Sequence, residues 1–394
     1  MALLPPLTRV ELNRALLARQ HLLERATTGT VDAVEHLVGL QAQNAWSPYV
    51  GLWSRVAGFT HDDLGDALLD RRLVRTAVMR GTIHLLSARD ARVLPTLTAP
   101  LYERDLLTNT QHGPALRTLD VAAVTARART LVEEEPRPST VLGRLLAQDW
   151  PDVAPTTLAY AARGTLPLVQ VPPRGVWGRS GATTWTTTDA WLGAPDGTVP
   201  DVRDPDVLAA ELERLVLRYL AAFGPASVAD VQAWSGLTGL AAVVERLGDR
   251  VVRFAAEPAP GRSRPREVLD VPDGPRPPAQ TPAPVRFLPD LDNVLLGHAD
   301  RTRIVSDEQR RAMQSRNGVV PGTVLVDGEV AATWRVQRDR LEPGPGRRRR
   351  ERATLVVTPF APLAAHHRRE VALEAEAFVT FFADDAAERS VVVT

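Results

Sequence analysis

The sequence predicts an α+β fold, with a repeated unit of helices and strands in residues 1–284 and a β-rich domain with a closing helix in residues 285–394. The length of 394 residues suits two to four domains. Apolar residues make up 44% of the chain, which is enough for several cores. The strongest observation is that one order of helix caps, helix ends and strands recurs along the chain.

The repeat is most distinct in residues 227–255, where Ser227 can cap a short helix and Gly236 can end it. Thr238 then caps a second short helix, and Gly248 ends that helix before the strand-like segment VVRF. A longer amphipathic helix precedes this unit, and the strand-like segment REVLDV follows it. A long helix, two short helices and two strands form the topology of a winged helix, a variant of the helix-turn-helix.

The same order occurs in residues 139–171, where Ser139 caps a helix, Pro155 begins another and Gly164 ends it before TLPLVQV. The first hundred residues contain a looser copy with four helices and two strands. We expect these helices near residues 8–19, 31–40, 48–56 and 61–71, and the strands near residues 73–79 and 82–86. The sequence therefore predicts three winged-helix domains in tandem.

The last part of the chain has a different pattern. Residues 256–284 are rich in Pro and Gly and are expected to form a long wing and a linker. Residues 320–336 contain two strand-like runs around Asp-Gly, which predicts a hairpin, while residues 351–360 predict a further strand and residues 362–383 an amphipathic helix. We expect three winged-helix domains and a β-rich, barrel-like domain with a closing helix, at residues 1–97, 98–200, 201–284 and 285–394.

Composition excludes several functional classes. The basic and acidic residues both total 47, so a globally basic protein that coats nucleic acid is excluded. Cysteine is absent and the eight histidines are scattered, so we expect no metal. None of the basic residues is lysine, which excludes Schiff-base chemistry on a lysine, and we expect no cofactor. The chain begins without a signal-peptide pattern and has no apolar run of 18 residues, so we expect a cytoplasmic protein without a membrane segment.

The second short helices of the repeats offer few side chains for reading bases. Their sequences, TTLAYAAR and GLAAVVERL, lack the stripe of Arg, Asn and Gln that contacts base edges. Sequence-specific control of transcription is therefore disfavoured.

The turn between the two short helices of the first unit contains Gln41 and Gln43. Ser47 and Pro48 are expected to be the cap and the first residue of the following helix. Because the two glutamines are two residues apart on non-helical backbone, their side chains can point the same way. Taken alone, the pattern also fits polar residues that satisfy backbone groups at helix ends.

Three motifs occur together: the Gln-x-Gln triplet, MRGTIHLLS at residues 79–87, and FLPDLDNVLLGHADRTRI at residues 287–304. In this order, over nearly the whole chain, they resemble the AlkZ family of winged-helix DNA glycosylases. The resemblance implies excision of N7-alkylguanine from double-stranded DNA, including bulky adducts and interstrand crosslinks. It also implies a concave DNA-binding surface on which Gln41 and Gln43 position the attacking water. The related YcaQ branch has an aspartate at the second position, so the chain is similar to the Gln-x-Gln branch.

The implied chemistry suits these residues. Glutamine does not titrate, so it cannot act as a general base. Guanine alkylated at N7 is cationic and leaves as a neutral base, so its departure requires no proton. The sugar passes through an oxocarbenium-like state, which two amides can favour by orienting water and by placing their carbonyl oxygens near the positive charge. Without lysine, we expect a monofunctional glycosylase that has no lyase activity.

Three further candidates for contact with DNA or substrate lie in the first unit. Trp46 could stack on a base or adduct, or it could belong to the core beneath the turn. Arg80 lies at the start of a strand that carries His84 on one face. His84 could face the DNA, or its hydrogen bonds could be satisfied within the sheet.

The C-terminal motif supplies three more candidates. His298, Arg301 and Arg303 could contact phosphates at the edge of the cleft. Alternatively, Asp300 with Arg301, or Asp292 with an arginine, forms a buried pair that closes the domain.

Two other features of this part of the chain bear on the resemblance. Family members often carry an aromatic residue where this chain has Leu291, so the match is less exact there. The run Arg347–Arg350 is expected to be a loop tip, either solvated or directed at DNA as a basic finger.

The sequence thus predicts a monomeric, monofunctional DNA glycosylase that binds double-stranded DNA containing alkylated guanine, through arginine–phosphate contacts. One alternative is a non-catalytic winged-helix DNA-binding protein with a structural or regulatory role. Another is a protein-interaction scaffold built from winged helices.

Overall fold

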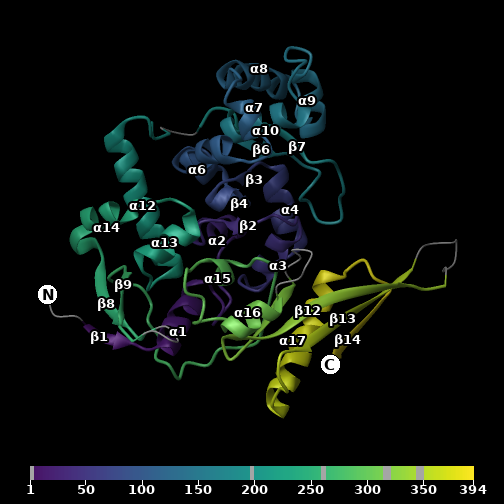
Figure 1. Cartoon of the computed structure of the whole chain (residues 1–394). Coiled ribbons are helices and arrows are strands. Elements are labelled where there is room, and N and C mark those ends of the chain that lie inside the picture. Colours follow the sequence, from purple (N-terminus) through teal and green to yellow (C-terminus); the bar gives the residue numbers. More distant parts are fainter. Residues whose placement is uncertain (1–3, 196–198, 259–262, 314–320, 343–349) are drawn as a thin grey trace.

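The computed structural model of the chain describes residues 4–195, 199–258, 263–313, 321–342 and 350–394. It is a mixed α+β structure in which helices pack around three sheets of three, five and six strands (Figure 1). The elements as far as residue 87 are β1 Leu4–Leu7, α1 Arg9–Arg19, α2 Thr30–His36, β2 Leu40–Gln41, α3 Ser47–Trp53, α4 His61–Leu69, β3 Leu73–Ala77, the 3₁₀ turn η1 Met79–Gly81 and β4 Ile83–Ser87. Those from residue 88 to residue 192 are α5 Ala88–Ala91, α6 Leu94–Thr108, α7 Gly113–Leu116, α8 Val121–Glu134, β5 Arg137–Pro138, α9 Ser139–Leu146, α10 Pro155–Thr165, β6 Leu168–Gln170, β7 Thr184–Thr187 and α11 Thr188–Leu192.

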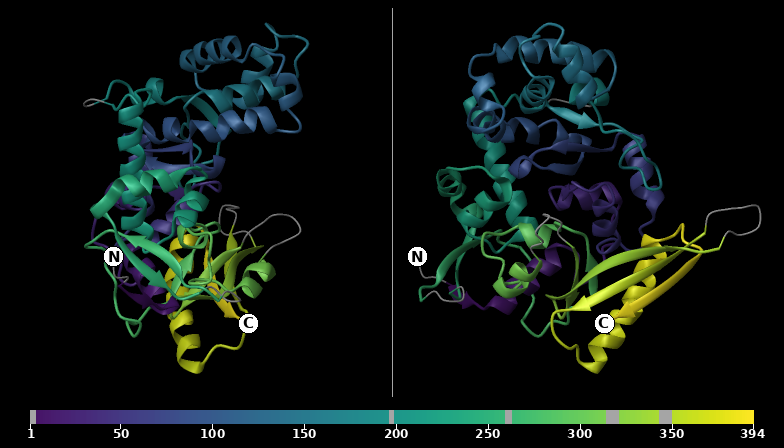
Figure 2. Two further views of the ribbon diagram at one scale, coloured as in Figure 1. Left: turned by 60° about the vertical axis from the view of Figure 1, so that its left-hand side comes forward. Right: turned by 45° about the vertical axis from the view of Figure 1, so that its right-hand side comes forward.

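The second half of the chain contains a further helical region and the C-terminal sheet. The helical region comprises α12 Pro205–Phe223, α13 Val228–Ser235, α14 Leu240–Leu247, the 3₁₀ turn η2 Gly248–Arg250, β8 Val252–Ala256 and β9 Arg266–Asp270. The remainder comprises β10 Arg286–Leu288, α15 Asn293–Leu296, α16 Asp307–Met313, β11 Gly322–Val326, β12 Glu329–Arg340, β13 Glu351–Pro359, α17 Ala365–Phe382 and β14 Glu388–Val393. Figures 1 and 2 show helices α6 to α10 at one end of the molecule and the C-terminal sheet with α17 at the other.

Helix ends follow the expected capping chemistry in some units but not in others. Ser227 caps α13 in a capping box with Asp230, as the sequence predicts. The prediction for Ser139 and Ser47 was wrong, because each is the first residue of its helix and the cap position is Pro138 or Trp46. Their hydroxyl groups are therefore not used for capping.

The six-stranded sheet has the order β2-β4-β3-β6-β7-β5. Its central antiparallel pair is β3 with β6, in which Thr76 lies opposite Val169. The sheet therefore continues across residue 97, where the sequence suggests a domain boundary, and it places the strands of the first two units edge to edge.

The three-stranded sheet joins the N-terminus to the third unit. Strand β8 pairs with β9 antiparallel and with β1 parallel, giving the order β1-β8-β9. The first and third units are therefore also connected by backbone pairing.

The C-terminal sheet is open, with the order β10-β11-β12-β13-β14, so the expected barrel-like closure was wrong. Its β11–β12 hairpin turns at Asp327–Gly328, as the Asp-Gly signal predicts. Strand β14 follows α17 and pairs parallel with β13, and the first and last strands of the sheet do not meet. Helix α17 covers the apolar face of the sheet, where Phe378 packs against Phe287 and Trp334.

A buried ion pair connects this sheet to the first unit. The pair joins Arg55, which follows α3, to Asp292, which caps α15. The side chains of both residues are fully buried. The guanidinium donates two hydrogen bonds to the carboxylate, of 2.9 and 2.7 Å. The contact is bidentate, the geometry in which a buried charge pair is best satisfied.

Across the described ranges, no helix is both long and apolar enough to cross a membrane.

We predict that Asp292→Ala lowers the free energy of unfolding by about 3–5 kcal/mol, because it leaves the Arg55 cation buried and unpaired. Denaturant unfolding followed by circular dichroism measures this loss. Asp149→Ala serves as the control, since it removes a largely exposed pair with Arg127 and should cost less than about 1 kcal/mol. Equal losses in the two variants would contradict the structural role of Arg55–Asp292.

Candidate active site

Gln41 lies at the end of the short strand β2, where the chain leaves the six-stranded sheet. Its backbone is paired with β4 at His84, and only 8% of the residue is exposed. The side-chain Oε1 accepts a hydrogen bond of 2.7 Å from Nη2 of Arg80. Because a guanidinium can only donate, this contact fixes which end of the amide faces Arg80 and directs the Nε2 group elsewhere.

Arg80 connects this glutamine to the third unit. It lies in η1, between β3 and β4, with a left-handed backbone (φ 54°). Its Nη1 donates to the carbonyl oxygen of Trp234, near the C-terminal end of α13, where a cation is favoured. At Gly236 (φ 83°), which follows α13, an added Cβ would lie 3.2 Å from the Arg80 backbone. The third unit therefore packs directly on the residue that orients Gln41.

Burial, with a smaller contribution from the neighbouring Arg301, lowers the pKa of Arg80 to about 10. The guanidinium remains charged at neutral pH. Arg301 is partly exposed, and its side chain makes no hydrogen bond or ion pair within the described ranges. Arg80 is therefore a cation in contact with Gln41, and Arg301 is a second cation in the neighbourhood of Arg80.

Gln43 lies in the bend that follows β2 and is exposed. Its Oε1 accepts a hydrogen bond of 3.2 Å from the backbone N–H of Ile83, the first residue of β4. The intervening Ala42 is held at both backbone groups, since its N–H donates to Ile83 and its carbonyl accepts from Arg75. The side-chain carbonyl of Gln41 thus accepts from Arg80, and that of Gln43 accepts from Ile83. Neither side-chain NH₂ group donates a hydrogen bond within the described chain.

The C-terminal motif holds the chain on both sides of the glutamines. Asp290 accepts hydrogen bonds from Asn44 and from the hydroxyl of Ser47, the latter at 2.5 Å. Asn293 donates to the carbonyl of Gly39, immediately before β2, at 2.9 Å. The segment FLPDLDN therefore fixes the position of the turn through hydrogen bonds of Asp290 and Asn293. Burial raises the pKa of the Asp290 carboxyl, while the hydrogen bonds from Ser47 and Asn44 oppose that rise.

Trp46 lies between the glutamine turn and the C-terminal sheet. Its ring makes edge contacts with Trp334 and Phe382, at centroid distances of 5.9 and 5.5 Å. It is only partly buried, and it also lines a surface depression with Trp177. The structure therefore gives Trp46 both a packing contact and an accessible edge.

His84 is buried in the sheet beside Gln41, with 2% of the residue exposed. Its Nδ1 lies 3.0 Å from the carbonyl of Thr82. Burial lowers the pKa of His84 to about 3, with a further contribution from Arg80. The ring is therefore neutral at physiological pH and has no proton to give as an imidazolium acid.

Two of the three candidates in the C-terminal motif are enclosed. His298 is 1% exposed and contacts the carbonyl of Phe223, while Arg303 donates to the carbonyl of Pro225. Burial lowers the pKa of His298 to about 3. These side chains contact the third unit rather than the surface, so the structure leaves Arg301 as the accessible member of the trio.

Of the two closing ion pairs considered from the sequence, Asp292 forms one, with Arg55. Asp300 pairs with Arg266 at 3.0 Å rather than with Arg301. In the run Arg347–Arg350, residues 347–349 lie outside the described residues.

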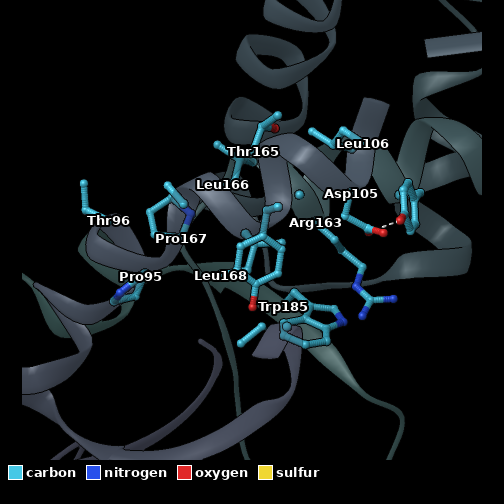
Figure 3. A pocket seen from close by; sticks show the side chains of 16 residues that line it. Pro95, Thr96, Asp105, Leu106, Arg163, Thr165, Leu166, Pro167, Leu168 and Trp185 are labelled. Atoms are coloured by element: carbon cyan, nitrogen blue, oxygen red, sulfur yellow. Dashed lines mark hydrogen bonds between the residues drawn. The ribbon is translucent and has the colours of Figure 1, made fainter. Parts of the chain in front are cut away.

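Sequence reasoning missed a second polar group on the other side of the glutamine turn. It comprises Arg75 of β3, Gln170 of β6 and Arg174, which line a depression together with Gln43. Arg75 within the apolar run LVRTA could have indicated this group, because a cation in a buried strand requires a hydrogen-bonding or acidic partner. An apolar pocket between α6, α10 and strands β6 and β7 adjoins this depression and shares Arg163 and Trp185 with it (Figure 3).

Neither glutamine lines that apolar pocket. No group of three or more His, Asp or Glu side chains able to hold a metal ion occurs in the part of the chain that the structure describes.

Comparisons with known proteins agree over most of the chain. A family model described as "DNA glycosylase AlkZ-like" matches residues 34–381. The chain is 26% identical over 364 residues to the "interstrand DNA cross-link repair glycosylase" of Streptomyces sahachiroi, covering 87% of this chain and 88% of that protein. The solved structure of the S. sahachiroi DNA glycosylase AlkZ is similar with a TM-score of 0.76 and 20% identity, covering 99% of this chain and 100% of that one, which shows the same fold.

We predict that His84 makes the stability of the fold sensitive to acid. Its pKa is about 3 in the folded chain and about 6.5 when unfolded, so the unfolded state binds the additional proton. Between these values, each pH unit of acidification should cost about 1.4 kcal/mol through this residue. Denaturant unfolding of wild type and His84→Gln from pH 7 to pH 4 measures the contribution of His84 to the pH dependence of the free energy of unfolding. An unchanged slope in the variant would contradict the assignment.

Proposed function

Because the chain belongs to the AlkZ-like DNA glycosylase family, we propose that it hydrolyses the N-glycosidic bond of N7-alkylguanine in double-stranded DNA. The observation that carries this proposal is the arrangement of Gln41 and Gln43, whose carbonyls are anchored and whose NH₂ groups remain without protein partners in the described structure. The name of the S. sahachiroi relative supports interstrand crosslinks as additional substrates.

In the proposed reaction the bond between C1′ of the sugar and N9 of the base breaks first. Its electrons pass to the cationic purine, which leaves as a neutral base, and the sugar develops oxocarbenium character. Water, oriented by the amides of Gln41 and Gln43, then adds to C1′ and loses a proton to solvent. Each amide carbonyl has two lone pairs, so it can face the developing cation while it keeps its anchoring hydrogen bond.

The surrounding titratable groups support a substrate that requires no acid. His84 is neutral, and the Asp290 carboxyl is occupied by hydrogen bonds from Asn44 and Ser47. A positively charged base can depart without either group. The same reasoning makes unmodified guanine a poor substrate, because its departure as an anion requires a proton donor.

We further propose that the enzyme is a monofunctional hydrolase without lyase activity. A lyase step through a Schiff base on a side chain requires the amine of a lysine, and the chain contains no lysine. An abasic site should therefore accumulate as the product.

The direct test measures base release from a duplex that contains a single N7-methylguanine. We expect Gln41→Ala and Gln43→Ala each to lower the single-turnover rate by about 100-fold, because the water is no longer positioned. Binding to the same duplex should persist. The matched control is Gln148→Ala, which removes an exposed glutamine that follows α9.

Binding without base release by the wild type, on both small and bulky N7 adducts, would overturn the proposal. The chain would then be a DNA-binding protein without this chemistry. Release that survives in both glutamine variants would instead reject the proposed water-positioning pair.

Arg80 is proposed as a positioning residue that acts through Gln41. We expect Arg80→Ala to lower the single-turnover rate by about 10- to 100-fold, and the double variant with Gln41→Ala to be no slower than Gln41→Ala alone. Arg89→Ala, which removes an exposed arginine of α5, is the control for a general loss of charge. Multiplicative losses in the double variant would show that Arg80 acts independently of Gln41.

A further inference from the structure

The depression beside Gln43 is built from segments that are distant in the sequence. They are the bend after β2, the β3–β4 pair, the N-terminal end of α9, Arg163 of α10, and the loop between β6 and β7 with its flanking strands. Its lining includes hydroxyl, amide and guanidinium groups, and none of its lining residues is acidic. The residues are Gln43, Arg75, Ile83, Pro138, Ser139, Thr140, Arg163, Gln170, Arg174, Ala182, Thr183 and Trp185.

Arg75 lines this depression and carries an incompletely satisfied charge. Only 2% of the residue is exposed, and Nη2 donates to the carbonyl of Ala42 at 2.8 Å. Its Nε and Nη1 are buried and have no partner among the described residues. Burial lowers the pKa of Arg75 to about 10, with a further contribution from Arg174. A buried cation with one hydrogen bond is costly, and an anion in the depression would offset that cost.

The loop between β6 and β7 fixes the Arg75 side chain in place. Tyr49 donates to the carbonyl of Gly175 and accepts from the backbone N–H of Trp177, both at 2.9 Å. At Gly175 (φ 100°), an added Cβ would lie 3.0 Å from Cδ of Arg75. The guanidinium is therefore held rigidly, as a binding group requires.

The N-terminal end of α9 contributes a second group of donors. The helix begins at Ser139, its cap position is Pro138, and no side chain caps it. The hydroxyl groups of Ser139 and Thr140 line the depression and make no hydrogen bond within the described part of the chain. Uncapped backbone N–H groups at a helix start, with two hydroxyls beside them, are typical of phosphate sites.

Two more arginines border the depression. Arg174 is partly exposed on the β6–β7 loop, and Arg163 lies over the ring of Trp185 at 5.4 Å. Both guanidinium groups are without a hydrogen bond or ion pair to the described residues. Many surface arginines of this chain do have acidic partners, as Arg352 does in Glu388.

From these observations we propose that the depression binds one phosphodiester group of the DNA strand next to the damaged nucleotide, through Arg75, Arg174 and the start of α9. This inference rests on the proposed function, because it gives the DNA a register on the protein. A phosphate held here places the adjoining sugar beside Gln43, so the site positions the reacting carbon against the glutamine that orients water.

The first test measures binding to a duplex with a single 2′-fluoroarabino N7-methylguanine, whose glycosidic bond resists cleavage, as a function of salt. We expect Arg174→Ala to weaken binding and to reduce the slope of log K against log[salt] by up to about 0.9, the value for one phosphate. Arg75→Met should act in the same direction. Arg179→Ala removes an exposed arginine from the same loop outside the depression and is the matched control.

The second test replaces the phosphates of the lesion strand, one at a time, by neutral methylphosphonates. We expect one position flanking the lesion to weaken the binding of wild type and Arg179→Ala by about tenfold, but to have little further effect on Arg174→Ala. Folded Arg174→Ala and Arg75→Met proteins that bind like Arg179→Ala, or a position effect that persists in Arg174→Ala, would overturn the site.

Failure of this site and failure of the proposed function remain distinguishable. The phosphate site is measured by binding to an uncleavable duplex, whereas the function is measured by base release from a cleavable one. Base release by the wild type with no effect at Arg174 rejects only the phosphate site. A position-specific phosphate effect without base release rejects only the chemistry.

Discussion

The buried ion pair of Arg55 and Asp292 is the constraint on which the geometry of the glutamine turn depends. It joins residues 237 positions apart, between the end of α3 and the start of α15, with both side chains fully enclosed. This pair helps to place the segment of Asp290 and Asn293 against the turn, where both side chains form hydrogen bonds. A bidentate pair of this kind specifies one relative position of two segments, which apolar contacts alone define less sharply.

A second consequence of the fold is that two kinds of arginine coexist in a chain of zero net charge. Many surface arginines, such as Arg246, pair with acidic side chains, whereas the desolvated Arg75 and Arg80 have no acidic partner among the described residues. Burial lowers the pKa of both from 12.5 to about 10, and both remain cations at neutral pH. A lysine starts from a pKa near 10.4, so an equal lowering would leave it partly neutral. The exclusive use of arginine therefore suits a site that must keep positive charge in a desolvated position.

Local sequence signals predicted individual helices and turns, but they did not predict how segments distant in the sequence pair and pack. The Ser227 cap of α13, the glycines that end α13 and α14, the Asp-Gly hairpin and helix α17 were predicted from the chain itself. The predicted cap Thr238 was wrong, because the cap position of α14 is Gly239 and no side chain caps that helix. The parallel pairings of β1 and β14 and the β3–β6 junction were not, because a strand's partner is chosen by tertiary packing rather than by its own propensity. At the site, the motif located Gln41 and Arg80 but gave no information about Arg75. Nor could residue type alone show that His298 and Arg303 point inward, because burial depends on the unit that packs against them.

The physical character of the glutamine site restricts the reactions that it can support. Its amides can orient water and face positive charge, but they cannot move a proton. The nearest titratable groups do not compensate, since His84 is neutral and Asp290 is held between Asn44 and Ser47. In the proposed reaction, the Arg80 cation in contact with Gln41 would oppose a further proton on the leaving base. Activation in the proposed reaction therefore comes from the substrate, as a positive charge already present on the base, and the protein contributes the position of water and DNA. That proposal agrees with a turn held by the hydrogen bonds of Asp290 and Asn293 rather than surrounded by a group of perturbed acids.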